Sequence, residues 1–120
     1  MYATLGSIFD QTVSKFPNKE ALVDLKKGQR WTFGEWRDDV HRLANALTAA
    51  GVGKGDRVST FLFNTSELPT TLFACAKIGA IFNPINFRLK SEEVTYILND
   101  ATPKVVMFEE LLKDQVATIQ

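Results

Sequence analysis

The residues that most suggest chemistry are Gly-Val-Gly-Lys-Gly-Asp at positions 51–56. Glycines around a lysine are typical of loops whose backbone N–H groups hold a phosphate. Such a loop follows a strand and precedes a helix, so that the positive end of the helix faces the anion. Here the order is reversed, because a helical pattern ends near Gly51 and an extended pattern begins at Arg57. The nearby helix end is its negative end, and the sequence therefore favours a turn over a phosphate site.

Within this turn, individual residues have predicted structural roles. Gly51 suits the left-handed position that follows a helix. Lys54 can complement the negative end of that helix, and Asp56 can accept hydrogen bonds from N–H groups of the turn. Gly55 follows Lys54 where a phosphate loop needs the Ser or Thr that binds magnesium.

A second candidate is the basic loop Asn-Pro-Ile-Asn-Phe-Arg-Leu-Lys at positions 83–90. It follows the carboxyl end of a predicted strand, which is where open α/β sheets bind their ligands. Arg88 and Lys90 stand just before a predicted helix, and together with its N-terminus they could receive an anion. The alternative is a surface loop that Phe87 and Leu89 anchor to the core. The residues alone leave both interpretations open.

The remaining reactive side chains do not form a catalytic or metal-binding set. The single histidine, His41, lies on the polar side of a predicted helix, and the single cysteine, Cys75, lies in an apolar run. We expect the first to be solvated and the second to be a small buried residue. Adjacent acids on a helix point about 100° apart, so solvated surface is expected for them; the pairs are Asp38–Asp39, Glu92–Glu93 and Glu109–Glu110. The sequence thus predicts no catalytic residue and no metal ligand.

Hydrophobic periodicity indicates the elements that would position these residues. It predicts a helix from about Thr4 to Phe16 and a β-hairpin of two short strands, at 21–25 and 30–33. Thr32 and Glu35 have the spacing of a capping box, and they predict a second helix that ends before Gly51.

The second half of the chain alternates between extended and helical patterns. Apolar runs at 57–63, 80–84 and 104–108 read as buried strands. One helix is expected between a cap at 64–66 and Gly79, another begins after a predicted cap at Ser91, and 109–120 has a weak helical pattern. The predicted fold class is therefore α/β: a β-α-β-α-β parallel sheet with flanking helices, plus a small N-terminal helix and a β-hairpin.

Composition limits the classes of partner. The chain has 120 residues, a formal net charge of zero and 45% hydrophobic residues, which fits one soluble domain that binds no nucleic acid. The N-terminus lacks the pattern of a signal peptide, and the longest apolar stretch is shorter than a membrane span. With a single cysteine, the sequence predicts a cytoplasmic protein that has no transmembrane segment.

Four motifs, read in order, point to one family: Gly-Val-x-Lys-Gly-Asp-Arg-Val from 51, Asn-x-x-Glu from 64, Lys-x-Gly-Ala from 77 and Asn-x-Arg-Leu from 86. In this combination the chain resembles the N-terminal part of adenylate-forming enzymes, specifically AMP-forming acyl-CoA synthetases of the fatty-acid–CoA ligase type. The resemblance runs from about Ile8 to Phe108. It implies that residues 1–120 are a single domain and an N-terminal fragment of a larger adenylate-forming domain.

The resemblance also implies that the catalytic motifs lie in another part of the parent protein. Enzymes of this family make an acyl-adenylate from ATP and a carboxylic acid and then transfer the acyl group to CoA. Their phosphate-binding loop and catalytic lysine lie beyond this segment, so the 120-residue chain is expected to bind no cofactor and to be inactive alone, whereas ATP, Mg and CoA belong to the parent. One site carries over: in some relatives the arginine of the Asn-x-Arg-Leu loop, here Arg88, approaches the phosphates of CoA. Phe87 stands where the family often has proline.

Other functions remain open at this stage. A stand-alone, non-catalytic α/β module that binds a ligand or partner is the main alternative. A flavodoxin-like domain is a weaker one, because the predicted strand ends of this chain supply few phosphate-binding residues. A fragment of a ligase would expose apolar surface where the remainder of the ligase N-terminal domain packs. We therefore expect the chain to self-associate.

Overall fold

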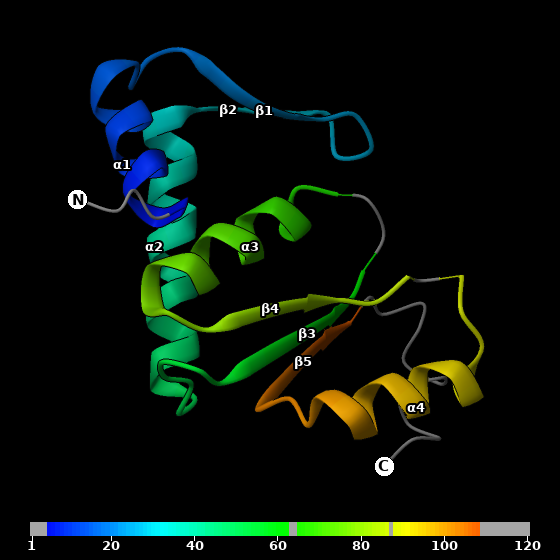
Figure 1. The fold of residues 1–120 in the computed structure, drawn as a ribbon. Helices are drawn as coiled ribbons and strands as arrows, with labels where there is room; N and C mark the ends of the chain where they lie inside the picture. The colour runs from blue at the N-terminus through cyan, green and yellow to red at the C-terminus, as the bar shows by residue number, and fades with distance from the viewer. Residues whose placement is uncertain (1–4, 63–64, 87, 109–120) are drawn as a thin grey trace.

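The computed structural model describes residues 5–62, 65–86 and 88–108. Within these residues, nine elements follow one another (Figure 1). In order they are α1 (Leu5–Lys15), β1 (Glu20–Asp24), β2 (Gln29–Thr32), α2 (Phe33–Ala49), β3 (Arg57–Phe61), α3 (Glu67–Ile78), β4 (Ile81–Pro84), α4 (Ser91–Ala101) and β5 (Val105–Phe108). The predicted α/β class and the β-α-β-α-β succession are confirmed, and the predicted tail helix at 109–120 lies outside the described residues.

Strand β3 is the centre of the three-stranded sheet, whose order is β4-β3-β5. Both neighbours run parallel to it, and Val58 is paired with Phe82 on one side and with Val105 on the other. The predicted strand at 57–63 ends earlier, at Phe61. All four residues from Val58 to Phe61 are buried, as expected for a strand covered on both faces.

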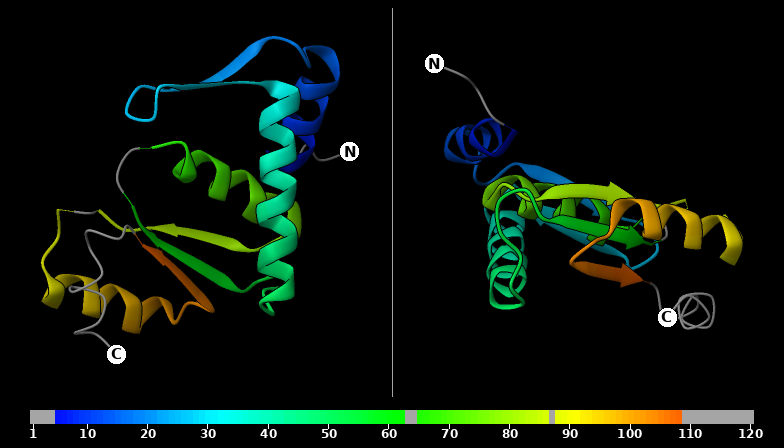
Figure 2. Two further views of the ribbon diagram at one scale, coloured as in Figure 1. Left: turned by 180° about the vertical axis from the view of Figure 1, so that it is seen from behind. Right: turned by 60° about the horizontal axis from the view of Figure 1, so that its bottom comes forward.

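The two faces of this sheet carry different helices (Figures 1 and 2). Val58 packs in a core built with residues of α1, α2 and α3, whereas Phe61 packs with Val94 and Leu98 of α4. Chain order explains this arrangement. The connection through α3 leads from β3 to β4, and the connection through α4 leads back across the sheet from β4 to β5, in the opposite direction. Because both crossovers have the same hand, their opposite directions place the two helices on opposite faces of the sheet.

Three aromatic rings join α1, α2 and α3. Phe9 stacks on Phe73 with ring centroids 4.7 Å apart, and both rings meet Trp36 edge-on at 5.2 and 5.3 Å. The indole Nε1–H of Trp36 donates a 2.9 Å hydrogen bond to Thr70 Oγ1, so the polar atom of this large ring is satisfied. The cluster fixes the two longest helices against the N-terminal one.

The N-terminal elements follow the sequence-based expectations closely. The capping box of α2 is confirmed: Glu35 N–H donates to Thr32 Oγ1 at 3.2 Å, and Thr32 N–H donates to Glu35 Oε1 at 2.9 Å. The two hairpin strands begin and end one residue earlier than predicted. A bulge between Glu20 and Leu22 interrupts their antiparallel pairing.

The predicted caps of α3 and α4 need correction. Ser66 is at the N-cap of α3 but makes no capping hydrogen bond with its hydroxyl. At α4 the N-cap residue is Lys90, and the predicted cap Ser91 is the first residue of the helix. The acid at the third helical position of α4 is Glu93, and its Oε1 lies 3.5 Å from the Lys90 N–H that is directed to it. A serine at the N-cap would instead accept a hydrogen bond with its hydroxyl from the N–H of the third helical residue.

Candidate functional site

The glycine-rich turn at 51–56 joins the end of α2 to the start of β3, as its sequence predicts. Gly51 has a φ of +94°, and Gly53 N–H donates to Asp56 Oδ2 at 2.8 Å, which confirms the predicted left-handed position and the predicted acceptor. Lys54 lies beside Gly79 at the end of α3, while the Lys104 side chain approaches Gly51 at the end of α2. Carbonyl ends of two helices thus surround this turn, which is unfavourable for a phosphate.

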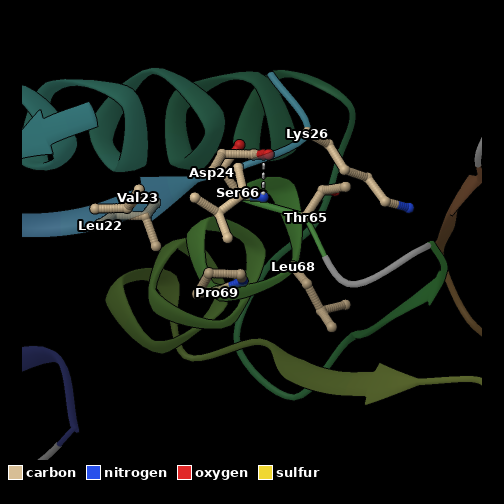
Figure 3. Close-up of a pocket in the computed structure, with 9 residues that line it drawn as sticks. Leu22, Val23, Asp24, Lys26, Thr65, Ser66, Leu68 and Pro69 are labelled. Carbon is tan, nitrogen blue, oxygen red and sulfur yellow. Dashed lines mark hydrogen bonds between the residues drawn. The ribbon is translucent and has the colours of Figure 1, made fainter. Parts of the chain in front are cut away.

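A hollow of about 380 Å³ lies between the hairpin and the N-terminus of α3 (Figure 3). Asp24 lines this hollow: its Oδ2 accepts a 3.0 Å hydrogen bond from Ser66 N–H, and its Oδ1 accepts one of 3.1 Å from Lys27 N–H. These backbone donors, Ser66 first, hold the pKa of Asp24 below its ordinary value. The helix N-terminus is therefore already capped from within the chain, and the hollow does not present it to an external anion.

A second hollow, of about 300 Å³, is lined by residues that include Trp31, Leu43 and Met107. Lys27 and Glu67 form an ion pair at its rim. Burial alone would raise the pKa of Glu67, but hydrogen bonds from Lys27 and from Thr65 outweigh it and lower the value. The charged groups at this rim are therefore paired in a way that fastens the hairpin to α3.

The loop from Ile85 to Lys90 is the candidate site, because it stands at the carboxyl edge of the parallel sheet. It begins at a fixed point, where Ile85 N–H donates to the carbonyl of Thr60 on the central strand at 2.8 Å. Asn86 then accepts two hydrogen bonds: its side-chain Oδ1 from Arg88 N–H at 2.9 Å and its carbonyl from Leu89 N–H at 3.1 Å. These bonds form a compact turn with Arg88 at its tip.

The structure brings the two predicted basic residues of this loop to the surface. Arg88 and Lys90 are both exposed, whereas Leu89 packs on the core cluster of α4 and β3, as predicted for an anchoring residue. Phe87, the other predicted anchor, lies outside the described residues. At the N-terminus of α4, the N–H of the N-cap residue Lys90 is already directed to Glu93 Oε1, at 3.5 Å. The loop thus presents the exposed guanidinium of Arg88, whose planar fork suits an anion, at the edge of the sheet.

The other reactive residues occupy structural positions. Cys75 is buried, and desolvation raises the pKa of its thiol to about 11, while His41 is exposed on α2. Asp39 pairs with Arg42 at 2.7 Å, and Glu92 and Glu93 are exposed. Within the described ranges no group of three His, Cys, Asp or Glu side chains is placed to hold a metal ion. Across the same residues the structure has no helix of the length and apolarity that a membrane crossing requires.

Two of these contacts were not anticipated from the sequence. The Asn-x-Arg spacing is compatible with a turn closed by the asparagine side chain, and that local signal would have identified Asn86. The contact of Asp24 with Ser66 had no local signal, because Ser66 is in a separate element far along the chain.

Comparison with known proteins gives consistent matches. The family model for AMP-binding enzymes matches residues 9–120. The long-chain fatty-acid–CoA ligase FadD13 of Mycobacterium tuberculosis is 36% identical over 87% of this chain and 21% of its own length. The long-chain fatty-acid–CoA ligase of Thermus thermophilus is 34% identical over 97% of this chain and 23% of its own. The chain therefore spans less than a quarter of the length of these two relatives.

The fold agrees with these matches. The crystal structure of the N-terminal domain of FACL13 from Mycobacterium tuberculosis superposes with a TM-score of 0.94 and 32% identity, over 98% of this chain and 30% of that domain. The parallel sheet, the hairpin and the N-terminal helix are all included in an overlap of this extent. The chain belongs to the AMP-binding enzyme family and corresponds to the N-terminal part of its acyl-CoA ligases.

Proposed function

We propose that this chain is the N-terminal scaffold portion of a fatty-acid–CoA ligase. The parent would convert ATP, a fatty acid and CoA into acyl-CoA through an acyl-adenylate, in the cytoplasm. The observation that carries the proposal is the family match over residues 9–120, supported by relatives named as long-chain fatty-acid–CoA ligases. Residues 1–120 would then be one folded part of a larger adenylate-forming domain.

The described residues suit a structural role. The ion pair of Lys27 and Glu67 fastens one element to another, and the glycine turn is surrounded by carbonyl ends of helices. We therefore assign the ATP and Mg²⁺ sites, and every catalytic residue, to the rest of the parent. What this segment supplies is a rigid sheet whose carboxyl edge presents the Arg88 loop.

The test compares the isolated chain with the longer ligase that contains it. Both are assayed for pyrophosphate exchange into ATP that depends on fatty acid, and for acyl-CoA formation. We expect both activities in the ligase and neither in residues 1–120 alone. Turnover by the isolated chain would overturn the scaffold proposal, and a parent protein without acid-dependent exchange would overturn the assignment as a ligase.

Within this function we propose that Arg88 contacts the phosphates of CoA. Its exposure, its place after β4 and the bidentate geometry of a guanidinium support this role. In the ligase, Arg88→Ala should raise the Michaelis constant for CoA at least about tenfold, because a charge-assisted hydrogen bond is lost. Arg42→Ala, which removes an exposed arginine from α2, is the matched control. An unchanged CoA constant in Arg88→Ala would contradict the contact.

We also propose that the isolated chain self-associates through apolar surface that the remainder of the ligase covers. Leu25 is 88% exposed at the tip of the hairpin, and Val23 and Leu68 line the adjacent hollow. Sedimentation of the isolated chain should show oligomers that Leu25→Ser weakens. A monomer at high concentration that binds no apolar dye would contradict this expectation.

A further inference from the structure

We propose that Asn86 is a positioning residue, which holds the Arg88 backbone in the conformation that presents its guanidinium to CoA. This inference rests on the proposed function, and it assigns a role within the loop to a residue other than the arginine. It follows from the two hydrogen bonds that Asn86 accepts, one from Arg88 N–H and one from Leu89 N–H.

The loop is anchored at both ends, and Asn86 organises what lies between. At the start, Ile85 is buried and bonded to the central strand through Thr60. At the far end, Leu89 packs on the core cluster that contains Phe61, Val94 and Leu98. Arg88 lies between these anchors and is exposed. Asn86 Oδ1 accepts the backbone N–H of Arg88 at 2.9 Å and thereby restrains the backbone at that residue.

This local bond matters for affinity because an exposed arginine loses conformational freedom when it binds a phosphate. A turn that already fixes the backbone N–H and Cα of Arg88 reduces the freedom that must be lost on binding. The Asn86 side chain is itself exposed and contributes little to the core. Its removal should therefore weaken ligand binding more than it weakens the fold, which distinguishes a positioning role from a structural one.

The experiment measures CoA binding to the full ligase by calorimetry for Asn86→Ala, Asn86→Ser and Arg88→Ala. We expect Asn86→Ala to raise the Kd for CoA about three- to tenfold, the range for one neutral hydrogen bond. Asn86→Ser should lie between wild type and Asn86→Ala, because a serine hydroxyl can close the same turn more weakly. In steady state the CoA Michaelis constant should rise, while kcat and the constants for ATP and fatty acid stay within about twofold.

The double variant Asn86→Ala/Arg88→Ala provides the sharpest comparison. If Asn86 acts through the arginine, the Kd of the double variant equals that of Arg88→Ala alone. Three results would each overturn the proposal. The first is a double variant whose increase in Kd is the product of the increases in the two single variants, and the others are a wild-type Kd in Asn86→Ala and a wild-type Kd in Arg88→Ala. Asn99→Ala, an exposed asparagine on α4, is the matched control and should bind CoA as wild type does.

The proposed function and the role of Asn86 can fail separately. Fatty-acid-dependent pyrophosphate exchange does not require CoA and judges whether the parent is a ligase, whereas the CoA titration judges Asn86. If Asn86→Ala lowers the thermal midpoint by many degrees, Asn86→Ser decides the matter. An unchanged Kd in a folded Asn86→Ser protein, together with a lost fold in Asn86→Ala, would show that the residue is structural.

Discussion

The carboxylate of Asp24, at the last position of β1, accepts a hydrogen bond from the backbone N–H of Ser66 at the N-cap of α3. An acid from the hairpin thereby caps a helix of the α/β half. The side chain is only 5% exposed, and its other oxygen accepts from Lys27 N–H. The two parts of the molecule are thus joined by a buried polar contact as well as by the Lys27–Glu67 ion pair.

We expect Asp24→Asn to lower the thermal midpoint at neutral pH, because an amide offers a single, uncharged acceptor to two N–H groups. The folded pKa of Asp24 lies below its ordinary value of 3.8, so the carboxylate contributes its full stabilisation above that value. The contribution is lost as the pH falls through the lower, folded pKa. Thermal midpoints of wild type and Asp24→Asn should therefore converge at acidic pH, whereas Asp100→Asn, an exposed acid on α4, should differ little at any pH.

The capping box of α2 makes a second prediction. Thr32→Ala removes the acceptor for Glu35 N–H and should lower the free energy of unfolding by about 1 kcal/mol. Thr48→Ala is a matched control, because Thr48 is an exposed residue inside the same helix and its hydroxyl donates to the carbonyl of Ala44. Urea unfolding followed by circular dichroism measures both. Equal losses in the two variants would show that the cap contributes nothing specific.

The aromatic cluster should dominate the stability of the N-terminal half. Phe9 is 4% exposed and contacts both Trp36 and Phe73, so Phe9→Ala should cost about 3–5 kcal/mol through lost burial and the cavity left behind. Phe16 is 42% exposed and lies under the ammonium of Lys19, so Phe16→Ala should cost about 1 kcal/mol or less. The same urea experiment compares them, and similar losses would contradict the central place of Phe9.

Cys75 should be unreactive in the folded protein. Its thiol is 1% exposed and has a pKa raised to about 11 by burial, so at pH 8 the thiolate fraction is roughly a hundredfold smaller than for a free cysteine. A thiol reagent should label the native chain far more slowly than the urea-unfolded chain, which has one cysteine to label. Equal labelling rates in the two states would show that the site opens readily.

Local patterns in the sequence were enough to predict most of the fold. A continuous apolar run predicted the strand at Val58, and Gly51 predicted the left-handed position after α2, where its φ is +94°. Gly79 predicted the end of α3, where its φ of +74° is also left-handed. The cap of α4 was assigned wrongly, because Ser91 is the residue type that prefers this position but Lys90 occupies it. Residue preference indicates that a helix starts, yet the exact register depends on where the preceding loop is anchored.

The candidate site was predictable only in part. Chain order placed the Arg88 loop at the carboxyl edge of the sheet, and the exposure of Arg88 agrees with that. The competition for the helix N-terminus could not be predicted in detail, since it depends on how Glu93 turns back toward Lys90. The contact between Asp24 and Ser66 could not be predicted for a different reason, because hydrogen bonds between distant elements leave no periodic signal in a sequence.

The central position of β3 has a consequence for synthesis on the ribosome. This strand emerges first, but its partners Phe82 and Val105 are translated only after a complete helix has been added each time. At about 5–20 residues per second, the backbone edges of β3 stay unpaired for seconds. During that interval the residues from Val58 to Phe61, which are buried in the folded protein, are exposed in the nascent chain and form an aggregation-prone segment. Binding by a chaperone at this stage would protect the segment until β5 completes the sheet.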